Sequence, residues 1–169
     1  VCSSDLILID TGSPVTIHNH DLFYFLSDKF DILPYHSKLS IQKLSKLTNI
    51  NNLTTLLGTD IMSNYKILFD YKHKQLIFSH LNDNSFQAKS MNIYSFLDIP
   101  VIELKINNEL LKFFLDSGAK YSYLLKSITE KYKSVGKIND FYPGIGIFES
   151  DSYQINTEFD NNIFSAVYG

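Results

Sequence analysis

A short pattern that occurs twice constrains this chain of 169 residues more than any other feature of its sequence. In each copy an apolar segment ends in Asp, and a hydroxyl residue, Gly and a small residue follow. The copies are LILIDTGS over 6–13 and KFFLDSGA over 112–119, and their aspartates, Asp10 and Asp116, lie 106 positions apart. Because internal repeats mark repeated structural units, we expect two related halves, each with a strand that delivers an aspartate to a turn.

The composition is that of a globular protein with a hydrophobic core. Apolar residues make up 44% of the chain and charged residues 20%, which separates it from disordered proteins. The formal net charge is −3 and the basic residues form no stripe, so we expect no nucleic-acid partner. The longest apolar runs, such as 113–115, are too short to cross a bilayer, and we expect no membrane segment in this chain.

Local patterns predict a chain made mostly of β-strands with short helices. In the first half, LLGTDIM over 56–62 predicts a strand, a glycine turn and a short helix capped by Thr59 or Asp60. The remaining elements of this half are a hairpin over 65–71 and 75–78 and helices over 20–26 and 40–47, with no long hairpin between 17 and 56.

The second half is predicted to consist of hairpins. The first covers 101–106 and 110–115, turns at Asn107-Asn108 and delivers Asp116. The next covers 144–148 and 152–159, with its turn at Glu149-Ser150-Asp151. A final strand is predicted over 163–168.

The domain boundaries follow from the repeat and from a polar segment without periodicity between its copies. We assign 6–80 to an N-terminal lobe, 81–98 to a linker and 99–169 to a C-terminal lobe. We expect the second lobe to be truncated, because it lacks a clear counterpart of LLGTD; residues 166–169 (AVYG) are an alternative beginning of one. The opening residues 1–5 resemble a cloning scar, and we expect the chain to be a fragment.

Paired carboxyl groups can hydrolyse a peptide bond without a metal or a covalent intermediate. An ionised carboxylate polarises a water molecule, and a protonated partner donates to the carbonyl oxygen. Two like charges about 3 Å apart do not both ionise easily, so the pair shares one proton over a wide pH range. Asp10 and Asp116 are our candidates for this pair.

The residues beside each aspartate suit the same task. Gly12 and Gly118 permit tight turns and a close approach of the two backbones. The hydroxyl groups of Thr11 and Ser117 can form hydrogen bonds to the opposite loop and so join the two halves. We therefore expect these four residues to support the carboxyl pair.

With these pieces assembled, the chain resembles the aspartic peptidases of the retropepsin and pepsin type. More narrowly, it resembles bacterial retropepsin-like proteins with two lobes in one chain. The resemblance rests on IDTGS over 9–13, LLGTDIM over 56–62 with the hairpin after it, and LDSGA over 115–119. It covers 6–80 well and 99–169 in part.

The resemblance implies a mostly β, bilobal acid-protease fold with short helices and two homologous lobes. It also implies an aspartic-type endopeptidase with a dyad of Asp10 and Asp116, a peptide or protein substrate in the cleft, and no cofactor. The flap that closes over substrate in this family has no clear counterpart in the first half. The hairpin over 144–159 is the candidate for that role.

Two other interpretations stay open. The two Asp-x-Gly loops can be ordinary turns in unrelated β-domains that never meet. The fold can also belong to a catalytically inactive relative that binds an extended peptide. His18 and His20 have poor spacing for a metal site, so we predict no metal. Asp60 and Asp70 are interpreted as structural.

Overall fold

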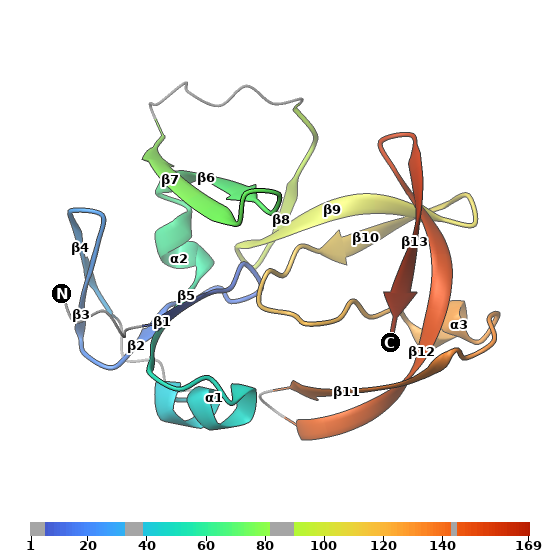
Figure 1. The fold of residues 1–169 in the computed structure, drawn as a ribbon. Coiled ribbons are helices and arrows are strands. Elements are labelled where there is room, and N and C mark those ends of the chain that lie inside the picture. Colours follow the sequence, from blue (N-terminus) through green and yellow to red (C-terminus); the bar gives the residue numbers. More distant parts are fainter. Residues whose placement is uncertain (1–5, 33–38, 82–89, 143–144) are drawn as a thin grey trace.

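The computed structural model describes residues 6–32, 39–81, 90–142 and 145–169, and most of their regular structure is β-strand (Figure 1). The mostly β class expected from the sequence is confirmed. Three of the predicted features lie wholly or partly outside the described residues: the opening segment 1–5, much of the linker at 82–89, and Gly144.

The first half is organised around a central strand, β5. Its described elements are β1 (Leu6–Ile9), β2 (Ile17–His18), β3 (Leu22–Phe25), β4 (Asp28–Asp31), α1 (Ile41–Thr48), β5 (Leu53–Leu57), α2 (Thr59–Met62), β6 (Tyr65–Asp70) and β7 (Gln75–His80). Strand β5 pairs in parallel with β1 on one side and antiparallel with β2 on the other.

Two hydrophobic clusters cover the two faces of this small sheet. Successive side chains of a strand point to opposite faces, and Leu56 and Leu57 accordingly belong to different clusters. Leu56 packs with Ile41 and Leu44 of α1, whereas Leu57 packs with a set that includes Ile61 of α2. Both faces of the strand that supports Asp10 are therefore anchored in the core.

The second half is a sheet of six strands. Its described elements are β8 (Tyr94–Phe96), β9 (Ile99–Ile106), β10 (Glu109–Phe114), α3 (Lys126–Thr129), β11 (Gly136–Tyr142), β12 (Gly146–Phe159) and β13 (Asn162–Tyr168). Its buried cluster consists of Ile106, Ile155 and Tyr168. The predicted β9–β10 hairpin is confirmed, and Asn107 and Asn108 turn it with φ values of 52° and 65°.

Several other predicted elements of the sequence are confirmed. Helix α1 begins after Ser40, whose hydroxyl accepts a hydrogen bond from the amide of Lys43. The hairpin predicted over 65–78 is β6–β7, the strand and short helix predicted over 56–62 are β5 and α2, and the final strand is β13. The expected cap of α2 is wrong: Gly58 occupies the N-cap position and provides no side-chain hydrogen bond.

The helix predicted over 20–26 is wrong, since this segment forms the β3–β4 hairpin. Its aromatic residues follow a period of two: Phe23 is buried, Tyr24 is exposed, and Phe25 packs inward against the same cluster as Phe23. Aromatic residues in alternation favour a strand with one buried face. That burial decides the local structure here.

The turn predicted at Glu149–Asp151 is also wrong. Strand β12 runs without interruption through these residues and pairs with β11, a strand that the sequence patterns did not reveal. Glu149, Ser150 and Asp151 pair with residues of β11 near the solvent, and Glu149 forms an ion pair with Lys137. The hairpin is instead closed by the pair Tyr142 and Gly146.

Strand β8 lies inside the segment predicted as a linker, where it pairs with β9.

Candidate active site

The two Asp-containing loops of the repeat lie against each other. Each is held by a neighbouring strand of its own half: the amide of Asp10 donates to the carbonyl of Leu57 at 3.0 Å, and the amide of Leu115 donates to the carbonyl of Pro100 at 2.8 Å. The structure thus brings together two loops that are 106 residues apart in sequence, and the interpretation as unconnected turns does not describe it.

Four hydrogen bonds join the loops in a reciprocal arrangement. The Thr11 amide donates to Ser117 Oγ at 3.1 Å, and the Ser117 amide donates to Thr11 Oγ1 at 2.9 Å. The Thr11 hydroxyl then donates to the Leu115 carbonyl at 2.5 Å, and the Ser117 hydroxyl to the Ile9 carbonyl at 2.8 Å. Each hydroxyl both accepts and donates across the contact, so both positions need a hydroxyl residue.

The glycines of the repeat lie against the carboxyl groups of the opposite loop. A Cβ built on Gly12 would lie 2.3 Å from Asp116 Cγ, and a Cβ on Gly118 would lie 2.6 Å from Asp10 Cγ. Separations this short are not tolerated in real structures. Glycine is therefore required at both positions by the close approach of the two halves, and the two carboxyl groups lie together between the loops.

Backbone amides of each loop orient its own carboxylate. The Gly12 amide donates to Asp10 Oδ1 at 2.9 Å. The amides of Gly118 and Ala119 donate to Asp116 Oδ1 at 2.9 and 3.1 Å. Asp10 is half-buried, whereas Asp116 is exposed, so the carboxyl groups have related bonding but unequal contact with solvent.

The environment of Asp10 favours its protonated form. Burial is the largest cause, and the charge of Asp116 and a hydrogen bond with that residue add to it; together they raise the pKa of Asp10 from 3.8 to about 7. Hydrogen bonds from the amides of Gly12 and Ser13 act in the opposite direction and limit the rise. A carboxyl group with this pKa can hold a proton in weakly acidic solution and donate it to a bound group.

A second set of hydrogen bonds fixes the chain that follows Asp10. The amide and hydroxyl of Thr16 donate to the carboxylate of Asp60 at 2.9 and 2.6 Å. The Thr16 hydroxyl also accepts from the Gly58 amide at 3.0 Å. Asp60 is structural, as expected, but it supports the Asp10 loop through Thr16, a buried residue that sequence analysis missed. A threonine between two apolar residues, Val15 and Ile17, is the only local signal it carries.

The second half has a related arrangement after Asp116. The amide of Gly169 donates to the Ser122 carbonyl at 2.9 Å, and the Leu124 amide donates to the Gly169 carbonyl at 3.2 Å. A Cβ on Gly169 would meet the Tyr123 ring at 2.4 Å, as one on Gly58 would meet the Val15 carbonyl at 2.5 Å. The segment 166–169, named above as a possible counterpart of LLGTD, thus lies beside the chain that leaves its Asp loop.

The histidines that sequence analysis weighed as metal ligands have other contacts. His18 Nδ1 lies 2.7 Å from Thr55 Oγ1, and the His18 ring packs against Phe23. In the described ranges, no three His, Cys, Asp or Glu residues come together in a way that could hold a metal ion. The same ranges contain no helix that is long and apolar enough to cross a membrane.

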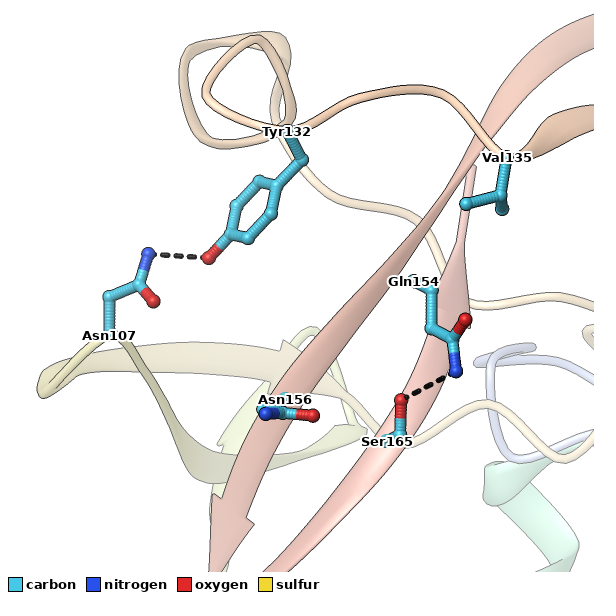
Figure 2. A pocket seen from close by; sticks show the side chains of 6 residues that line it. All are labelled: Asn107, Tyr132, Val135, Gln154, Asn156 and Ser165. Atoms are coloured by element: carbon cyan, nitrogen blue, oxygen red, sulfur yellow. Dashed lines mark hydrogen bonds between the residues drawn. The ribbon is translucent and has the colours of Figure 1, made fainter.

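A pocket of about 410 Å³ lies in the second half, apart from the carboxyl pair. Figure 2 shows the residues that line it: Asn107, Tyr132, Val135, Gln154, Asn156 and Ser165. Its polar groups largely bond to each other, since Asn107 donates to Tyr132 and Gln154 donates to Ser165. It contains no ionisable pair, so we place the candidate active site at Asp10 and Asp116.

No protein-family model matches this chain, and no curated protein matches it.

Proposed function

We propose that this protein is an aspartic-type endopeptidase of the retropepsin-like kind, with a bilobal acid-protease fold and a catalytic dyad of Asp10 and Asp116. The observation that carries the proposal is the interlocking of the two loops, in which each carboxyl group lies against the glycine of the other half. Two ordinary turns have no physical reason for this reciprocity. Two carboxyl groups can share a proton only when they lie close together, and this contact brings them close.

The reaction follows from the different environments of the two carboxyl groups. The raised pKa of Asp10 favours it as the protonated partner. Asp116 takes a proton from water while the water oxygen attacks the carbonyl carbon, and Asp10 gives its proton to the carbonyl oxygen. In the resulting diol, Asp116 protonates the amide nitrogen and Asp10 recovers a proton from a diol hydroxyl. The C–N bond then breaks, releasing an acid and an amine.

The first test is hydrolysis of a diverse peptide pool between pH 3 and pH 8 by the wild type, Asp10→Asn and Asp116→Asn. Each substitution removes one member of the acid–base pair, so we expect the rate to fall by about 10²–10⁴-fold. Activity of the wild type should decline as the pH rises through about 7, where Asp10 loses its proton.

Asp70→Asn is the matched control, because Asp70 lies at the end of strand β6 and, among the described residues, its carboxylate bonds to His73 in the exposed β6–β7 turn. It should retain wild-type activity. Full activity in either dyad variant would contradict the proposal. If the folded wild type cleaves nothing but retains a peptide, the protein is the inactive peptide-binding relative instead.

A further inference from the structure

The β11–β12 hairpin of the second half contacts both halves of the molecule. In Figure 1 the two strands extend from the second half to α1 of the first. Two consecutive residues of β11 make the contacts: Asp140 is bonded within the second half, and Phe141 packs against the α1 cluster of the first. Successive strand residues point to opposite faces, so the hairpin is held from its two faces by different halves.

Tyr123 makes the contact within the second half. Its hydroxyl donates to Asp140 Oδ2 at 2.8 Å, and its ring lies 5.8 Å from the ring of Phe148, centroid to centroid. Asp140 on β11 and Phe148 on β12 are directly paired across the hairpin. The Tyr123 side chain therefore contacts both β11 and β12 at one directly paired position.

Phe141 makes the contact with the first half. It packs against the buried cluster of Ile41, Leu44, Leu53 and Leu56. Leu8 and Ile17, which flank the Asp10 loop, pack against the same cluster. The hairpin therefore contacts, through Phe141, the hydrophobic cluster that supports the Asp10 loop.

Tyr123 and one residue packed against the same cluster as Phe141 stand at the same spacing from the two aspartates. Tyr123 stands seven positions after Asp116, and Ile17 stands seven positions after Asp10. The hairpin therefore connects the chain leaving one Asp loop with the core beside the chain leaving the other.

We propose that Tyr123 is a positioning residue that fixes the β11–β12 hairpin to the chain leaving the Asp116 loop, while Phe141 fixes it to the opposite half, so that the hairpin helps to hold a peptide at the dyad. This inference rests on the proposed function, because it assigns the hairpin the task of holding a peptide at the dyad. In this proposal one hairpin, from the second half, holds the peptide, and that hairpin contacts the first half at α1.

The test compares Tyr123→Phe with Tyr132→Phe. Each substitution removes one phenolic hydroxyl that forms one hydrogen bond within the described part of the chain, but Tyr132 bonds to Asn107 in the pocket of Figure 2. We expect Tyr123→Phe to speed hydrogen exchange in 137–142 and 145–149 by roughly tenfold, as for loss of one bond to a charged acceptor. Tyr132→Phe should leave these segments unchanged.

Peptide hydrolysis provides the second measurement. Tyr123→Phe should raise KM by roughly tenfold with a smaller change in kcat and an unchanged pH profile, since the carboxyl pair is intact. Asp140→Asn retains an acceptor for the hydroxyl and should recover part of the loss that Asp140→Ala causes.

The outcomes separate the two proposals. Unchanged hydrogen exchange in Tyr123→Phe overturns the proposal that Tyr123 holds the hairpin, whether or not the protein cleaves peptides. Faster exchange with wild-type KM shows that the hairpin is held by Tyr123 but does not position substrate, which also overturns the inference. An inactive wild type with the expected exchange pattern refutes the peptidase and leaves Tyr123 as a structural contact only, so the positioning role fails with it.

Discussion

At the scale of single residues, the contact between the two Asp loops depends on glycines, which leave room for the opposing carboxyl groups, and on hydroxyl side chains, which form hydrogen bonds across the contact. Gly12 and Gly118 admit the opposing carboxyl groups, while the hydroxyls and amides of Thr11 and Ser117 form the four hydrogen bonds across the contact. These contacts predict that even one added methyl group should separate the halves.

Gly12→Ala tests this expectation. The new Cβ would lie 2.3 Å from Asp116 Cγ, so either the carboxyl group or the loop must move. We expect a loss of about 1–3 kcal/mol in the free energy of unfolding and loss of peptide hydrolysis. Ser165→Thr adds a methyl group on the exposed face of β13 and should change neither. Chemical denaturation and the peptide assay measure both, and an active, stable Gly12→Ala would contradict the described contact.

The residues of the loops could be predicted because they repeat, but their support could not. Asp10, Thr11 and Gly12 were found by comparison with 116–118, a signal that is present in the sequence alone. Thr16 and Tyr123 carry no such signal, because their partners lie 44 and 17 positions away. Only the folded chain brings those side chains together.

At the scale of elements, the β9–β10 hairpin could be predicted because its turn has standard residues. Asn107-Asn108 tolerates positive φ and marked the β9–β10 hairpin correctly. The β3–β4 hairpin turns instead at Leu26 and Ser27, which have φ values of 54° and 112°. Such residues give no turn signal, and the neighbouring aromatic run was interpreted as a helix. The burial of Phe23 outweighs the cost of this turn.

That cost predicts a stabilising substitution. Replacing Leu26 and Ser27 with Asn and Gly places residues that accept positive φ in the two-residue turn. We expect the free energy of unfolding to rise by about 1 kcal/mol, which corresponds to an increase of roughly 2–4 °C in Tm for a chain of this size. Leu26→Lys, which removes the exposed apolar side chain without relieving the backbone, is the control in thermal denaturation. An equal gain in the control would show that backbone strain is not the cause.

At the scale of the whole molecule, the contact between the halves places a carboxyl group where it is more easily protonated than in the unfolded chain. Folding therefore takes up a proton in the range where Asp10 is protonated in the folded state and ionised in the unfolded state. That range extends from its ordinary pKa of 3.8 to about 7.

The pH dependence of stability should follow from this difference. The stabilisation linked to Asp10 is fully present below pH about 3.8 and is lost as the pH rises toward 7, because the ionised form is the more costly one in the fold. Denaturant titrations of the wild type and Asp10→Asn at intervals from pH 4 to pH 8 isolate this contribution from that of other groups. The difference in stability between them should grow in favour of Asp10→Asn as the pH rises. A constant difference would show that the carboxyl group titrates normally.

The distance in sequence between the two halves of the site also affects when the site can form. Strand β1 can pair with β5 as soon as the first half is complete, whereas the Leu115 carbonyl, which accepts the hydrogen bond of the Thr11 hydroxyl, lies 104 positions after Thr11. Contacts between residues so far apart form late, because a long loop must close first. During synthesis on the ribosome, Asp10 therefore lacks its partner carboxyl group until the segment around Asp116 has been made.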